Sequence, residues 1–203
     1  MATVNSYTGD MPTPDRTSLD AIVLAARDLL ERDGLPGLTM QAVADRVGVR
    51  APSLYKRVRN RDDLIRLVAE STLTELAAEL DAAPDARHLL GTFRAFGLAR
   101  PAAFRLIMTP GDTTAAAAVS RSLAGTVSAG ILRAARKLAG EQNALVAART
   151  LTAWAAGFVS MELNGGFNLG GDPAEAWEFG LDRIVAAIST EPVGRSAESP
   201  PNR

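Results

Sequence analysis

Residues 39–58 read TMQAVADRVGVRAPSLYKRV, a stretch with the spacing of a helix-turn-helix. Thr39 can cap a short helix that runs through Val47, because its hydroxyl can accept a hydrogen bond from an unpaired N–H of the first turn. Gly48 follows in the turn, where glycine adopts a positive φ at little cost. A second helix is expected over residues 51–58.

Small and apolar side chains allow these two helices to cross. Ala44 is small enough for the second helix to pass close to it, and Leu54 falls ten residues later in the chain. Two short helices that cross at a steep angle need this pattern of a small residue, a glycine and an apolar residue. Ordinary helical proteins also contain such pairs, so the spacing alone leaves DNA binding open.

The charge distribution favours DNA binding. Residues 46–61 hold six basic residues and no acid, although the whole chain has 22 Lys+Arg against 23 Asp+Glu and a net charge of −1. Residues 16–66 are net +3, and the segments before and after are each net −2. A basic stripe confined to one motif indicates phosphate contact. The alternative, a solvated helix face, does not explain why acids are missing here.

The rest of the chain has helical periodicity, and the predicted fold class is all-α. Asn60 is expected to cap a helix of about twenty residues. Further helices are expected at about 18–33, 85–99, 101–108, 112–138, 142–164 and 173–189. The domain organisation predicted from these elements is a flexible arm (1–17), a helix-turn-helix domain (18–66), a helical ligand-binding and dimerisation domain (67–190) and a disordered tail (191–203).

Composition argues against catalysis and against a membrane location. The chain has no cysteine and a single histidine, His88, so thiolate chemistry and His-cluster metal sites are excluded. No catalytic residue, metal site or cofactor is predicted. The chain shows neither a signal peptide nor a sufficiently apolar span, and a cytoplasmic protein is expected. Its two lysines among many arginines are typical of a GC-rich bacterial genome.

Residues 37–64, GLTMQAVADRVGVRAPSLYKRVRNRDDL, resemble the DNA-binding domain of TetR-type transcriptional regulators. The shared features are the capping Thr, the Ala and Gly at the turn, the Leu-Tyr pair and the Asn-Arg-acid start of the next helix. The chain departs from many members at residues 55–58, which read YKRV where Tyr-x-His-Phe is common. Residues 100–108, RPAAFRLIM, look like the short Pro-led helix of the family. Trp154 and residues 165–167 are similar to the Trp…His-Gly signature of one C-terminal subgroup, with Ala156 where that subgroup often has His.

The resemblance implies a double-stranded DNA operator as partner and assigns roles in the motif. At the position of Thr39 the family contacts a phosphate, and Arg57 could reach a phosphate where relatives use His. The helix N-termini would present Gln41, Arg50, Ala51 and Ser53 to the major groove, where Gln suits adenine and Arg suits guanine. A phosphate contact is the alternative for Arg50. Phosphate contacts are expected for Tyr55, Lys56, Arg57 and Arg61, whereas Arg46 and Arg59 could simply be solvated.

The C-terminal half is expected to bind a small-molecule inducer and a second copy of the chain. Candidate ligand-binding residues are Phe93, Phe96, Phe104, Met108, Trp154, Phe158, Met161 and Glu162. They share helix faces, and helical bundles build ligand sites from such residues, although any one of them could be a core residue instead. The homodimer is expected to form through the last two long helices, at about 142–164 and 173–189.

The prediction is therefore a ligand-responsive transcriptional regulator, most often a repressor by resemblance, which binds a palindromic operator. Two alternatives stay open at this point. One is a helical enzyme or small-molecule-binding protein that uses the C-terminal cavity. The other is an architectural DNA-binding protein without a ligand, which a cavity in the structure would disfavour.

Overall fold

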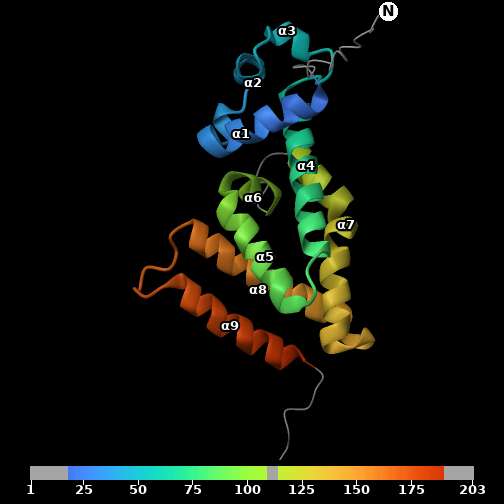
Figure 1. The fold of residues 1–203 in the computed structure, drawn as a ribbon, viewed down its shortest axis with the longest axis vertical. Helices are drawn as coiled ribbons and strands as arrows, with labels where there is room; N and C mark the ends of the chain where they lie inside the picture. Colours follow the sequence, from blue (N-terminus) through green and yellow to red (C-terminus); the bar gives the residue numbers. More distant parts are fainter. Residues whose placement is uncertain (1–17, 109–113, 190–203) are drawn as a thin grey trace, which may run out of the picture. The chain divides into compact units, whose positions relative to one another are not determined.

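The computed structural model describes residues 18–108 and 114–189, and these residues contain α-helices, one short 3-10 helix and no strand. The all-α fold class is confirmed. The chain divides into two compact units, with the boundary between Leu64 and Ile65. This boundary falls inside helix α4, Arg61–Asp81, so one continuous helix belongs to both units (Figure 1).

The N-terminal unit contains α1 (Leu19–Gly37), α2 (Met40–Val47), α3 (Ala51–Leu54) and the first turn of α4. The predicted end of the first helix at Gly34 corresponds to a break in conformation, with φ 69° and ψ −177°, after which one more helical turn follows. Helix α3 is shorter than expected, but the N–H of Val58 still donates to the carbonyl of Leu54 at 2.9 Å. Asn60 caps α4 as predicted, accepting from the N–H of Asp63 at 2.8 Å.

The C-terminal unit contains the rest of α4 and five more α-helices. They are α5 (Ala86–Ala99), α6 (Pro101–Met108), α7 (Thr114–Ala139), α8 (Ala144–Leu163) and α9 (Pro173–Ile188), with the 3-10 helix η1 (Glu141–Asn143) before α8. Their bounds lie within two residues of the predicted ones. The predicted arm (1–17) and the predicted tail (191–203) lie outside the described residues.

Helices α8 and α9 run antiparallel and are joined by residues 164–172, while α5 lies against both of them (Figure 1). Two glycines allow close approaches in this unit. A Cβ on Gly97 of α5 would meet Val159 of α8 at 2.7 Å, and a Cβ on Gly130 of α7 would meet the carbonyl oxygen of Leu80 in α4 at 3.3 Å. Both neighbouring helices therefore pass where a larger side chain would not fit.

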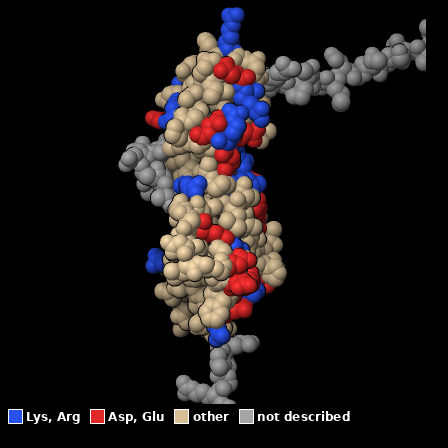
Figure 2. Space-filling model, turned by 90° about the vertical axis from the view of Figure 1, so that its left-hand side faces the viewer, with Lys and Arg blue, Asp and Glu red and all other residues tan. Residues whose placement is uncertain are grey.

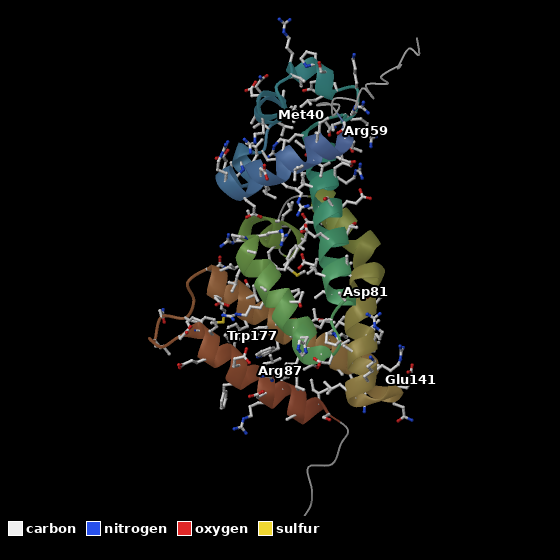
Figure 3. All side chains as sticks on the ribbon, in the orientation of Figure 1. Met40, Arg59, Asp81, Arg87, Glu141 and Trp177 are labelled. Carbon is white, nitrogen blue, oxygen red and sulfur yellow. The ribbon has the colours of Figure 1, made fainter. Side chains whose placement is uncertain are left out.

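Arginines provide the ion pairs between helices of the C-terminal unit. Arg87 of α5, which is labelled in Figure 3, pairs with Glu178 and Asp182 of α9. Arg133 of α7 donates to the carboxylate of Asp81 at the end of α4 at 2.9 Å. Arg100 lies 2.5 Å from the carboxylate of Glu75. The end of α4 and the middle of α9 are thus tied to their neighbours by guanidinium groups.

Candidate functional site

The turn between α2 and α3 has the geometry that the sequence predicts. The hydroxyl of Thr39 accepts from the N–H of Ala42 at 3.1 Å and caps α2. Gly48 ends α2 with φ 76° and ψ 38°, and its N–H donates to the carbonyls of Ala44 and Asp45. This left-handed cap turns the chain sharply enough for α3 to begin three residues later.

Leu54 fixes α3 to the rest of the unit. It is fully buried and is the only buried side chain of this four-residue helix. Val43 and Ala44 of α2 are also fully buried, as is Val58 after α3. The outward side of α3 is consequently positioned by one leucine and the turn that follows it.

The predicted DNA-binding residues lie on the surface of this unit. The exposed members are Thr39, Gln41, Arg50, Tyr55, Lys56 and Arg57, and the partly exposed ones are Ala51, Ser53 and Arg61. More than half of the Tyr55 side chain is accessible to solvent, at 54%. An exposed aromatic beside basic residues suits contact with a nucleic-acid backbone.

Two of these residues have partners that the sequence did not predict. The guanidinium of Arg61 donates from Nε to the carbonyl of Leu38 at 2.8 Å and from Nη2 to that of Leu35 at 2.6 Å. It thereby ties the start of α4 to the α1–α2 connection. The Gln41 amide nitrogen donates to the carboxylate of Asp45 at 2.7 Å, and this contact must open before the amide can pair with a base.

Acidic side chains on neighbouring turns and helices offset part of the positive charge of residues 46–61. Arg46 pairs with Asp28 of α1 at 3.1 Å, and Arg59 pairs with Asp63 of α4 at 3.6 Å. Figure 2 shows acidic and basic side chains next to one another on the visible face. Arg46, Arg59 and Arg61 therefore each have an intramolecular partner, which a contact with a phosphate would have to replace or share.

The C-terminal unit contains an apolar cavity of about 70 Å³. It is lined by residues of α4, α5, α6, α7 and α8, namely Leu80, Leu89, Leu90, Phe93, Met108, Val127, Ser128, Ile131, Thr152 and Ala155. The predicted ligand-binding residues Phe93 and Met108 meet here. Apolar cavities between helices are common ligand sites in bundles. A cavity also disfavours the architectural, ligand-free alternative.

The other predicted ligand-binding residues do not line this cavity. Phe96 and Phe104 are 1% and 2% exposed and are core residues. The ring of Phe104 packs edge-on against Phe93 with the centroids 5.3 Å apart, and Arg100 lies over the ring of Phe96 at 4.9 Å. These two phenylalanines therefore support the cavity wall and do not face its interior.

Trp154 and Phe158 belong to an aromatic cluster between α8 and α9. The ring of Trp154 stacks on Trp177 with centroids 4.7 Å apart, and Phe158 packs against Trp177 at 5.2 Å and Phe167 at 4.7 Å. Trp177 is 1% exposed and lies where α5, α8 and α9 meet (Figure 3). The sequence analysis did not identify Trp177, although its spacing of four from the buried Leu181 marks an inward face.

Glu162 forms a two-pronged ion pair with Arg94 of α5, with N···O distances of 2.9 and 2.6 Å. Both side chains are mostly buried, and Arg94 also lies over the ring of Trp177 at 5.4 Å. The hydrogen bonds to Glu162 raise the pKa of Arg94 above its ordinary value. Glu162 therefore joins α8 to α5, while the neighbouring Met161 is about half exposed.

Helices α8 and α9 expose large apolar side chains. Leu145, Val146 and Phe179 are 51%, 57% and 64% exposed. Residues Glu141–Leu163 form the one segment among the described residues that is long and apolar enough to cross a membrane, but core helices of soluble proteins share these properties.

Two family models match the chain. The model described as bacterial regulatory proteins, tetR family, matches residues 22–68, and the one described as tetracyclin repressor-like, C-terminal domain, matches residues 86–184. The first covers the helix-turn-helix, and the second contains most of the helices that surround the cavity.

Curated relatives are transcriptional regulators. An uncharacterized HTH-type transcriptional regulator of Mycobacterium tuberculosis is 31% identical over 164 residues, which are 75% of this chain and 73% of the relative. An HTH-type transcriptional regulator of Saccharopolyspora erythraea is 34% identical over 106 residues, and this match spans 52% of the chain but only 42% of the relative. The tetracycline repressor class A of Escherichia coli is 41% identical over 56 residues, 28% of this chain and 26% of the repressor.

Solved structures share the fold at low identity. A protein of unknown function from Rhodococcus sp. RHA1 superposes with a TM-score of 0.67 at 22% identity, covering 83% of this chain and 93% of that one. TetR-Q116A from Acinetobacter baumannii AYE, solved in complex with minocycline, gives a TM-score of 0.58 at 22% identity over 84% and 95% of the two chains. These likenesses extend the fold match across both units.

Proposed function

Because the chain belongs to the TetR family of DNA-binding transcriptional regulators, we propose that it is a ligand-responsive repressor that acts as a homodimer. The family places it among regulators and not among enzymes. The observation that carries the proposal is that α4 starts beside the helix-turn-helix and that its last turn contributes Leu80 to the apolar cavity. A ligand that moves Leu80 can thus change the position of α4.

The proposed DNA complex contains two copies of the helix-turn-helix on a palindromic operator. The two α3 helices enter successive major grooves about 34–36 Å apart. In this complex the DNA phosphates are contacted by Thr39, Tyr55, Lys56, Arg57 and Arg61. Gln41, Arg50, Ala51 and Ser53 face the bases.

The proposed inducer is a small apolar or aromatic molecule in the C-terminal cavity. It favours a dimer in which the two α3 helices have the wrong spacing, and it releases DNA because its affinity for the two states differs. We propose the domain limits 18–66 and 67–190 for these two activities, and a cytoplasmic location where operator and inducer are both accessible.

A binding experiment with the DNA upstream of this gene and of its neighbour tests the proposal. We expect a sequence-selective complex at nanomolar to micromolar protein, with an affinity that falls steeply as salt rises from 50 to 200 mM, because phosphate contacts release counterions. Scrambled DNA of the same composition is the control. Equal affinity for both DNAs, or no complex at micromolar protein, would refute the regulator.

Tyr55→Ala and Arg61→Ala are expected to weaken binding to all sequences alike but to differ in their effect on stability. Tyr55 is exposed, so its removal should change the free energy of unfolding by less than about 0.5 kcal/mol. Arg61→Ala removes two hydrogen bonds from a charged donor. Besides weakening DNA binding, it should lower the free energy of unfolding by about 1.5–3 kcal/mol. Fluorescence anisotropy and urea titrations measure the two effects. A changed base preference in either variant would contradict its assignment to phosphates.

Val146→Glu and Phe179→Glu should convert the proposed homodimer to a monomer, because each places a charge on the apolar surface of α8 or α9. Light scattering should give about 43 kDa for the unmodified protein, twice the 21.3 kDa of one chain, and about 21 kDa for the variants. Leu24→Glu, at an equally exposed leucine of α1, is the matched control and should stay dimeric. A monomeric unmodified protein would rule out the two-fold model.

A further inference from the structure

Among the residues that the structure describes, those that line the C-terminal cavity carry no ionisable side chain. Eight of the ten are hydrocarbon or thioether residues, and the polar exceptions are the hydroxyls of Ser128 on α7 and Thr152 on α8. The cavity is partly open and its lining includes the exposed Thr152, so an ionised ligand would lose hydration on its buried side, where the described lining residues offer no opposite charge. The lining therefore disfavours both anions and cations.

Two of the described ionisable groups that adjoin lining residues already have partners. Asp81 follows Leu80 and pairs with Arg133, and Arg94 follows Phe93 and pairs with Glu162. Arg149, one turn before Thr152, belongs to the exposed surface and is not among the lining residues. A charged ligand that recruited Asp81 or Arg94 would have to break an existing ion pair.

A different groove of about 350 Å³ lies between the start of α5 and the ends of α7 and α9, and it is lined partly by Asp85, Arg87 and Lys137. The C-terminal unit therefore places charged side chains beside this groove, but not among the described residues that line the apolar cavity. Arg87 in this groove is already shared by two carboxylates. The apolar cavity is thus the one suited to uncharged molecules, and the groove offers Lys137 as a contact for anions.

We infer that the ligand of the C-terminal cavity is an electrically neutral, mainly hydrocarbon molecule with one hydroxyl or carbonyl group, which bonds to Ser128 or Thr152. A side-chain hydroxyl both donates and accepts, so it suits either group. The inference rests on the proposed ligand response and narrows it to a chemical class. A ring-sized ligand exceeds the present volume and must displace wall residues, among which Met108 is the most adaptable.

Four small probes of similar size test the ligand class: benzyl alcohol, toluene, benzoate and benzylammonium. Each is titrated into the full-length protein by calorimetry, with the shift in Tm as a second readout. We expect benzyl alcohol to bind in a saturable way and to raise Tm, and both ions to bind at least tenfold more weakly. Benzoate or benzylammonium binding as tightly as the alcohol would overturn the inference, and so would the absence of alcohol binding.

Variants assign the binding to the cavity. Ala155→Leu fills it and should abolish binding of alcohol and toluene together. The double variant Ser128→Ala/Thr152→Val should lower the affinity for benzyl alcohol about five- to tenfold, to the affinity for toluene. Thr150→Val, whose hydroxyl bonds to the carbonyl of Val146, is the matched control and should bind as the unmodified protein does. If benzyl alcohol still binds to Ala155→Leu, its site lies outside the apolar cavity. Lys137→Ala then tests whether that site is the groove.

The DNA titration separates this inference from the proposed function. If the protein binds DNA selectively and in a salt-sensitive way but does not bind benzyl alcohol, the inference of a neutral ligand is refuted. The proposed function as a transcriptional regulator then still stands. Neutral-probe binding without any DNA complex would refute the regulator and leave the cavity chemistry intact.

Discussion

Replacing Trp177 with alanine is expected to lower the free energy of unfolding of the C-terminal unit by about 3–5 kcal/mol, the usual cost of emptying a buried aromatic site. The side chain is 1% exposed and joins α9 to α8 through its stack on Trp154 and its edge contact with Phe158, and to α5 through the Arg94 guanidinium above it. The deletion removes all three contacts at once. Urea titrations followed by far-UV circular dichroism measure the loss.

Leu169→Ala is the control for this change. Leu169 is 99% exposed in the segment between α8 and α9, so its truncation should change stability by less than about 0.5 kcal/mol. Trp177→Phe should recover part of the loss, because a smaller ring still fills much of the site. If Trp177→Ala unfolds at the same urea concentration as Leu169→Ala, the cluster does not hold α9 in place.

Leu54→Ala is expected to abolish selective DNA binding. Leu54 is the only buried residue of α3, and its truncation should cost the N-terminal unit about 2–5 kcal/mol. No other side chain of this four-residue helix is buried, so the side chains that face the bases lose their fixed position. Selective complexes are typically about 10³–10⁷ times tighter than nonselective ones, and most of this factor should disappear. Anisotropy titrations with operator and scrambled DNA measure it.

Leu24→Ala provides the comparison within the same unit. Leu24 is 61% exposed on α1, so the substitution removes the same number of atoms from the surface. Its DNA affinity and selectivity should match those of the unmodified protein. Selective binding by Leu54→Ala at unchanged affinity would show that α3 is positioned by its turn and not by this leucine.

Local signals made most of the fold predictable from the sequence. Thr39, Asn60 and Asp85 each cap a helix through their own side chain, and Gly34 and Gly48 adopt the positive φ that ends a helix. Pro101 begins α6. Such features depend on residues three or four positions apart, so a single sequence contains the information needed to place them.

Contacts between distant helices were less predictable. The pairing of Arg46 with Asp28 and the bonds from Arg61 to the carbonyls of Leu35 and Leu38 join residues 18 to 26 positions apart. Helical periodicity correctly grouped Phe93 with Phe96 as inward-facing residues. Periodicity could not show which of the two phenylalanines lines the cavity, because that depends on the volumes of the side chains that α4, α7 and α8 contribute.

The use of arginine in the ties between helices has a consequence for chemical modification. Ion pairs of Arg87, Arg94, Arg100 and Arg133 hold α4, α5, α7, α8 and α9 together, and a guanidinium does not react with acetylating reagents under mild conditions. The only lysines of the chain are Lys56 and Lys137. Acetylation, enzymatic or chemical, therefore spares the ion pairs of the bundle and neutralises a side-chain charge at just two places, one of them beside Tyr55 after α3.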